Sequence, residues 1–167
     1  MMWPSIIILG FVTLQRLAEL VIARRNTRAL MARGAREIGA EHYPVMVALH
    51  ASWLAGLWLL APGHPVQPIW LMLFVVLQLG RLWVLATLKG RWTTRIIVLP
   101  GASLVHEGPY RLFSHPNYAV VIGEIAVLPL ALGMPLFAAI FSILNGLMLW
   151  LRISVENRAL KTAMFLK

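Results

Sequence analysis

Long apolar runs dominate this chain, and short polar segments separate them. Five runs each approach the length of about 20 residues that a helix needs to cross a bilayer; they cover residues 3–23, 44–61, 69–88, 117–133 and 135–153. The fifth run keeps its helical pattern towards the C-terminus. Only Gly133-Met134-Pro135 separates it from the fourth, so these two helices are expected to form a tight antiparallel hairpin. The pattern predicts an all-α, polytopic membrane protein of about five transmembrane helices, in one domain over residues 1–167.

Composition agrees with a membrane location. Hydrophobic residues make up 60% of the chain, charged residues 13%, and the mean hydropathy is +0.78, which leaves too little charge to cover a soluble fold of 167 residues. A net charge of +9 would suggest nucleic acid in a soluble protein, but no nucleic-acid partner is predicted here because the basic residues lie between apolar runs. The absence of cysteine excludes disulfides and thiolate chemistry. The five histidines show no close ligand spacing, so no metal site is predicted.

The basic residues alternate between connections, and this alternation indicates an orientation. Lys and Arg are absent from residues 61–68 and from the Gly133 turn. They gather in the other connections and after the fifth run: Arg24, Arg25, Arg28, Arg33, Arg36, Lys89, Arg91, Arg95, Arg111, Arg158, Lys161 and Lys167. Because basic loops stay in the cytoplasm, the N-terminus is predicted outside and the C-terminus inside. We expect a multi-pass protein of a bacterial inner (plasma) membrane, with an active site that faces the cytoplasm.

Polar residues within the apolar runs fall at one depth. A rise of 1.5 Å per residue places all of them roughly 6–12 Å from the inner ends of their helices: Arg16, Glu19, His50, Arg81, Glu124 and Asn145. They could pair with one another, as Arg16 with Glu19 and Arg81 with Glu124, and so join the helices. A cavity that opens to the cytoplasm is the favoured interpretation, because such groups in a membrane are usually functional. On that interpretation, four of them contact a substrate: Arg16, His50, Arg81 and Glu124.

Two further groups of polar residues flank the last helical hairpin. The first is Gly108-Pro109-Tyr110-Arg111, closely followed by His115-Pro116-Asn117-Tyr118. Pro116 is expected to open the fourth helix, since the first helical position needs no backbone N–H. The second group is Arg152 and Glu156, spaced i,i+4 on one face of the fifth helix. From the residues alone, that pair could also be a surface salt bridge of at most about 0.5 kcal/mol.

Together the two groups resemble the isoprenylcysteine carboxyl methyltransferase (ICMT) family and its relatives among phospholipid N-methyltransferases, over about residues 91–160. The resemblance implies a membrane-bound methyltransferase that uses S-adenosylmethionine (SAM). It assigns Arg152 to the substrate side and, with Glu156, to catalysis. Relatives often carry two adjacent acids where this chain has Glu156-Asn157. The implied cofactor-binding residues are Leu104, Val105, Tyr110, His115, Pro116, Asn117, Tyr118 and Glu156.

The expected reaction is methyl transfer to an oxygen of a lipid-borne acceptor. That oxygen could belong to a carboxylate, as on a prenylated cysteine, or to a phenolic or enolic hydroxyl. A hydroxyl needs a base, for which His106, His115 and Glu124 are candidates. An alternative reaction is N-methylation of a phospholipid. An alternative class of protein is a non-enzymatic carrier or transporter subunit. The segment 37–43, with Glu37, Glu41, His42 and Tyr43, could either join the acceptor site or form an ordinary solvated interface.

Overall fold

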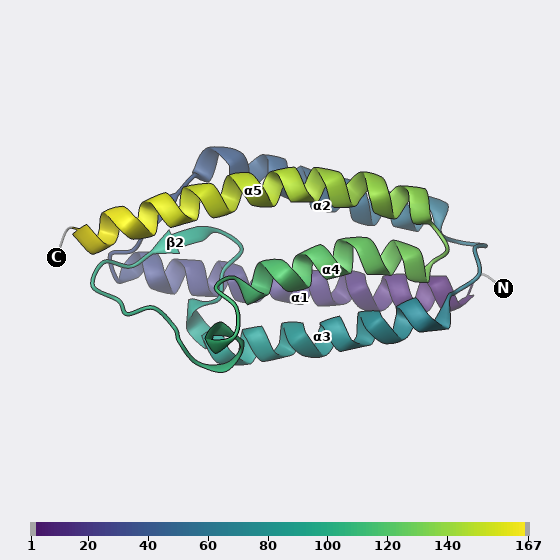
Figure 1. Ribbon diagram of the computed structural model, residues 1–167, viewed down its shortest axis with the longest axis horizontal. Helices are drawn as coiled ribbons and strands as arrows, with labels where there is room; N and C mark the ends of the chain where they lie inside the picture. Colours follow the sequence, from purple (N-terminus) through teal and green to yellow (C-terminus); the bar gives the residue numbers. More distant parts are fainter. Residues whose placement is uncertain (1–2, 166–167) are drawn as a thin grey trace.

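A computed structural model describes the backbone of residues 3–165 and the side chains as far as Ala159. Lys167 and the side chain of Lys161 therefore lie outside the described part. Five helices form a bundle in which the two ends of the chain lie at opposite ends (Figure 1). Their bounds are α1 Trp3–Ala32, α2 Tyr43–Leu60, α3 Pro68–Leu88, α4 Pro116–Ala131 and α5 Pro135–Phe165.

The helices are apolar enough to belong in a membrane. α1, α3, α5 and the segment Ala40–Leu60 have the length and composition to cross one. α4 is apolar but has only 16 residues, about 24 Å of helix, which is shorter than a hydrocarbon core of about 30 Å. Large apolar side chains point outward from the bundle, among them Leu59, Leu136 and Trp150, each more than 70% exposed. Lipid is the natural surrounding for such a surface.

The turn between α4 and α5 confirms the predicted tight hairpin. Gly133 adopts φ 71°, a left-handed conformation that favours glycine. Its N–H bonds to the carbonyl of Leu130, and the N–H of Met134 bonds to the carbonyl of Pro129. These two bonds satisfy carbonyls that the end of a helix leaves without partners, and they define a Schellman motif. The chain then enters α5 at Pro135.

A small antiparallel sheet corrects the all-α prediction. β1 (Arg36–Ile38) pairs with β2 (Ile96–Val98), and Glu37 lies opposite Ile97. Short 3-10 helices flank the sheet: η1 (Ala40–His42) follows β1, η2 (Lys89–Arg91) precedes β2, and η3 (Gly108–Arg111) precedes α4. The sheet ties the α1–α2 connection to the α3–α4 connection, and both strands contact α5.

Apolar packing and polar chemistry occupy different parts of the bundle. The main buried cluster joins Leu9 and Val12 of α1 with Trp53 and Leu57 of α2 and Leu128 of α4. The sheet, η2, η3 and the start of α4 lie at the end of the bundle near the C-terminus of the chain (Figure 1). The basic connections expected on one side of the membrane lie at that same end, because α1 and α3 both finish there.

Candidate functional site

A bonded network of charges joins three helices at the predicted depth. Arg16 of α1 donates to Glu19 of the same helix at 2.7 Å and to Glu124 of α4 at 2.6 Å. Arg81 of α3 donates to Glu19 at 3.1 Å and to both oxygens of Glu124. The two guanidinium groups thus bridge the two carboxylates, and the pairing interpretation is the one that the structure shows.

Two glutamine side chains complete this network. Gln15 donates to Glu19 Oε1 at 3.0 Å, and Gln78 donates to Glu124 Oε1 at 2.8 Å. Every carboxylate oxygen of Glu19 and Glu124 therefore accepts at least one hydrogen bond. Such complete pairing offsets the loss of hydration that burial imposes on these charges. A contact between Arg16, Arg81 or Glu124 and a substrate stays a prediction, and it would require one of these bonds to open.

His50 and Asn145 lie at the same depth without joining the network. The Nδ1 atom of His50 lies 2.9 Å from the carbonyl of Met46, one turn earlier in α2. His50 is also within electrostatic range of Arg16, Arg81 and Arg152. Asn145 of α5 is 2% exposed, and its Oδ1 has no hydrogen-bond partner among the described residues. His50 thus lies near the arginines of the network, and Asn145 is buried within the bundle.

The structure brings the two motif blocks into direct contact. Tyr118, in the first turn of α4, donates its hydroxyl to Glu156 Oε2 of α5 at 2.6 Å. The ring of His115 stacks on the ring of Tyr118 with 5.4 Å between centroids. Because α4 begins at Pro116, as predicted, His115 and Tyr118 lie one turn apart at the start of the helix. The fold therefore brings His115, Tyr118 and Glu156 together, and their role as a binding site stays a prediction.

Tyr110 lies near the same carboxylate. Burial, together with the neighbouring Glu156, raises the pKa of Tyr110 to about 12. Its phenol therefore stays neutral at physiological pH, where it offers a hydroxyl donor and an aromatic face. Such a face attracts a positively charged ligand group.

Arg152 is a buried cation rather than half of a surface salt bridge. Its side chain is 4% exposed, and its Nη2 donates to the carbonyl of Thr94 at 3.0 Å. Among the described residues it forms no ion pair with Glu156, and its Nε has no hydrogen-bond partner. A buried guanidinium with an unused donor favours an anionic ligand oxygen, because burial without such a partner is costly.

The segment around the sheet positions Thr94, which sequence reasoning did not single out. Arg95 pairs with Glu37 at 2.6 and 2.8 Å, and its guanidinium lies 4.1 Å from the centre of the Tyr43 ring. The Tyr43 hydroxyl lies 3.0 Å from the hydroxyl of Thr94. Glu37 and Tyr43 are thus part of a bonded framework that leads to Arg152. This framework depends on pairing between strands far apart in the sequence, so the local sequence pattern could not predict it.

The remaining predicted cofactor residues lie on or near the same loop. Pro116 is buried at the start of α4, and Asn117 Oδ1 lies 3.4 Å from the indole nitrogen of Trp92. Leu104 is 50% exposed, and Val105 is partly buried, in the segment before η3. Their contact with a cofactor stays a prediction.

Comparison with known proteins agrees with this arrangement of helices and motifs. The fold defines a helical membrane protein with polar side chains gathered at one end, and a family match assigns it to the class of membrane methyltransferases. Residues 70–162, more than half of the chain, match the model of the isoprenylcysteine carboxyl methyltransferase (ICMT) family, and the chain belongs to that family. The match begins earlier than the resemblance over residues 91–160, and it takes in most of α3.

One relative matches over nearly its whole length. The chain is 38% identical to "Uncharacterized protein YpbQ" of Bacillus subtilis (strain 168) over 166 residues, which is 96% of this chain and 97% of that protein. No solved structure matches.

Proposed function

We propose that this protein transfers a methyl group from SAM to an oxygen atom of a lipid-borne acceptor at the cytoplasmic face of a bacterial inner membrane. The observation that carries the proposal is the hydrogen bond between Tyr118 and Glu156, at 2.6 Å. It unites the motif before α4 with the motif on α5, and membership of the ICMT family gives both motifs a common chemistry.

The side chains at this site suit the chemical groups of SAM. SAM supplies an electrophilic methyl group on a sulfonium. The faces of Tyr110 and Tyr118 can attract that cation, while Glu156 can accept from an ammonium or a ribose hydroxyl. His115, stacked on Tyr118, can donate to an oxygen of the cofactor. The other implied cofactor residues, Leu104, Val105, Pro116 and Asn117, would line the adenosine.

Arg152 is proposed to hold the acceptor oxygen. Its Nη2 is engaged by Thr94 and its Nε has no partner among the described residues, so the free donor can point an anionic oxygen at the methyl group. Positioning of this kind supplies most of what an in-line displacement needs. A carboxylate acceptor requires no base, because it is already ionised.

A phenol or enol acceptor must lose a proton. His115 is the favoured base, since it lies beside Tyr118 and is only partly buried. Glu124 is less suited to that task because Arg16, Gln78 and Arg81 already occupy its oxygens. His106 lies on the exposed loop before η3. Arg16, His50, Arg81 and Glu124 stay proposed residues for binding the acceptor.

A non-enzymatic carrier is the competing function. A carrier needs polar groups along the whole path, whereas the far half of this bundle is filled by the apolar cluster around Leu9, Trp53, Leu57 and Leu128. N-methylation of a phospholipid remains a second reaction for the same site. The Arg152 guanidinium can hold an anionic acceptor oxygen beside the methyl group, whereas the amine nitrogen of a phospholipid gains nothing from a cation next to it, so we favour an oxygen acceptor.

The test is to incubate purified protein with methyl-labelled SAM and a panel of lipid acceptors. The panel should hold a prenylated cysteine, a long-chain phenol and phosphatidylethanolamine. Label in the organic phase with either of the first two supports the proposal. Label only in phosphatidylethanolamine replaces it with N-methylation, and no transfer together with no SAM binding removes the enzyme hypothesis.

A further inference from the structure

A basic groove lies at the same end of the bundle as the Tyr118–Glu156 site, between the last turns of α1 and α3. It encloses about 580 Å³. Its walls combine apolar and basic residues: Ile22, Arg25, Asn26, Ala29, Leu30, Arg33, Leu85, Lys89, Gly90 and Arg91. A neighbouring hollow of about 340 Å³ shares Leu30, Arg33 and Arg91 with it. Neither Tyr118 nor Glu156 lines either of them.

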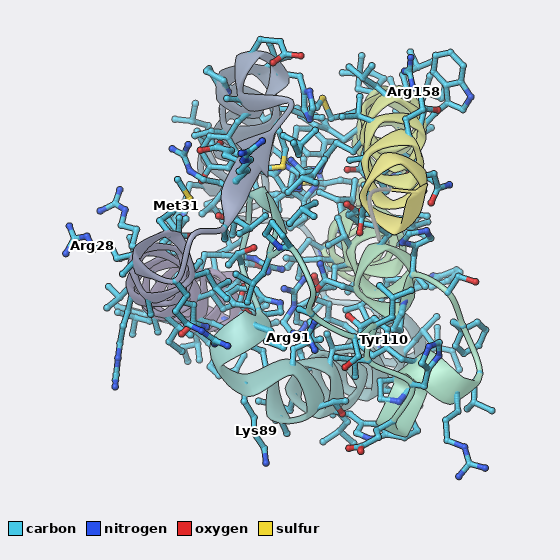
Figure 2. All side chains as sticks on the ribbon, turned by 90° about the vertical axis from the view of Figure 1, so that its left-hand side faces the viewer. Arg28, Met31, Lys89, Arg91, Tyr110 and Arg158 are labelled. Atoms are coloured by element: carbon cyan, nitrogen blue, oxygen red, sulfur yellow. The ribbon has the colours of Figure 1, made fainter. Side chains whose placement is uncertain are left out.

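The groove has an excess of positive charge that the protein does not neutralise. All six acidic residues of the chain are glutamates, and none lines the groove. Four of these glutamates are engaged elsewhere, at positions 19, 37, 124 and 156. Among the described residues, no ion pair involves Arg25, Arg33, Lys89 or Arg91. Four cationic residues thus line one hollow without a carboxylate, although the side chain of Lys89 projects away from it (Figure 2).

The floor of the groove is built rigidly. The buried Asn26 donates from α1 to the carbonyl of Lys89 at 3.0 Å and to the carbonyl of Trp92 at 2.8 Å. Within the described residues, Lys89 is the non-glycine residue that adopts a positive φ, 49°. A side chain is strained there, and such strain persists only where the surroundings hold it. Arg91 is fixed too, because it donates to the carbonyl of Ser103 at 2.7 Å.

Apolar helix surface continues from the groove along the bundle. Ile22 is 43% exposed, Val21 66% and Leu82 60%, on the two helices that form the walls. In the end view of Figure 2, Arg91 lies inside the outline of the bundle, between α1 and Tyr110, whereas the side chains of Arg28 and Lys89 project outward. A ligand with a phosphate among the arginines could therefore lay an apolar chain along α1 and α3.

We infer that this groove binds the headgroup of an anionic phospholipid. Basic pockets between transmembrane helices at the cytoplasmic side suit such headgroups, and each cation near the membrane surface strengthens the attraction. The cations supply the recognition of phosphate, and the exposed apolar residues of α1 and α3 distinguish a lipid from a free anion. Lipid binding at this groove does not depend on whether the protein transfers methyl groups.

The experiment is native mass spectrometry of the full-length protein in neutral detergent, titrated with phosphatidylglycerol or phosphatidylcholine. The wild type should hold one phosphatidylglycerol molecule more tightly than phosphatidylcholine. The test variant is R25Q/R33Q, whose arginines line the groove, and the matched control is R24Q/R28Q, which removes equal charge from the same segment. The test variant should lose about fivefold in phosphatidylglycerol affinity for each arginine removed, whereas the control should keep the wild-type affinity.

Three results would overturn the inference. Equal losses in both double variants would mean that the attraction is diffuse surface charge. Equal affinity for the two lipids would mean that no anionic headgroup is recognised. Displacement of the bound lipid by inorganic phosphate or by SAM would assign the groove to a free anion or to the cofactor. Because SAM binding by the same samples is measured separately, failure of this site and failure of the proposed reaction are distinguishable.

Discussion

Arg152 and Glu156 lie one turn apart on α5, yet their surroundings differ. Arg152 is buried and donates to Thr94, whereas Glu156 is partly buried and accepts from Tyr118. Residues on one helix face usually share one environment. Thr94, which precedes β2, accepts from Arg152, and Tyr118 at the start of α4 donates to Glu156 and also lies beside Arg152. The two side chains therefore meet at Tyr118 but have different bonded partners.

The first prediction separates their roles. Glu156→Gln should weaken SAM binding by about tenfold or more, because hydrogen bonds to a charged group contribute about 1.5–3 kcal/mol. Arg152→Ala should instead raise the KM for the acceptor while SAM affinity stays near the wild-type value. Isothermal calorimetry gives the first quantity and steady-state methyl transfer the second. The exposed Asn157→Ala is the neighbouring control and should change neither. If both substitutions had equal, small effects on SAM affinity and on the KM for the acceptor, Arg152 and Glu156 would have only a structural role.

The second prediction concerns the charge network. Glu124→Gln leaves Arg16 and Arg81 with Glu19 as their remaining carboxylate. Unfolding free energy should fall by about 3–5 kcal/mol, because one buried positive charge loses its partner. The double variant R81M/E124L removes one charge of each sign and should cost less than Glu124→Gln alone. Reversible unfolding in mixed micelles measures both, and a loss below about 1 kcal/mol for Glu124→Gln would contradict the structural role of the network.

Residue-level prediction from the sequence succeeded where local pattern carries the information. Depth along each helix follows from the rise per residue, and it placed Arg16, Glu19, Arg81 and Glu124 at one level, where they meet. Thr94 escaped notice because its role depends on a backbone carbonyl. No side-chain pattern marks a carbonyl that will accept from Arg152.

At the scale of elements, helices were easier to predict than the sheet. Apolar runs of helical length are unambiguous, and Pro116 and Gly133 mark the start and end of α4. Each strand has only three residues. Ile96-Ile97-Val98 is a β-branched run that favours a strand, but Arg36-Glu37-Ile38 carries no such signal. Their pairing joins segments about 60 residues apart, which local periodicity cannot reveal.

The third prediction tests the turn between α4 and α5. Gly133→Ala should lower the unfolding free energy by about 1–2 kcal/mol, because a left-handed conformation strains an L-residue. The added methyl would also lie 3.2 Å from the carbonyl oxygen of Pro65. Gly146→Ala is the control: it lies within α5 with nothing within 4 Å of the new methyl, so stability should stay equal or rise slightly. Similar losses of unfolding free energy at both positions would mean that the left-handed conformation at Gly133 does not require glycine.

At the scale of the whole molecule, the gathering of basic connections at one end is the feature that predicts orientation. The two connections at the other end, around His64 and Gly133, carry no Lys or Arg. The two ends of the chain lie at opposite ends of the bundle (Figure 1), as the predicted five crossings require. The gathering of basic connections at one end is confirmed, because charge in short loops is a local property, whereas the side of the membrane that this end faces stays a prediction.

The fourth prediction uses the absence of native cysteine. A single introduced cysteine is then the sole thiol in the chain. His64→Cys, at an exposed position between α2 and α3, should react with a membrane-impermeant maleimide added to intact cells. Ser103→Cys, in the exposed loop before η3, should react only after permeabilisation. The reverse labelling pattern would place the Tyr118–Glu156 site outside the cell and contradict access to cytoplasmic SAM.

The residues around Tyr118 and Glu156 are proposed to bind SAM. The decisive experiment is calorimetric titration of SAM into the purified protein in detergent, with the unfolding transition recorded on the same sample. We expect one saturable site for the wild type and a clearly weaker one for Tyr118→Phe, which loses the hydroxyl that contacts Glu156. A folded wild-type protein that binds no SAM, or a Tyr118→Phe variant that binds it equally well, would show that SAM does not bind at these residues.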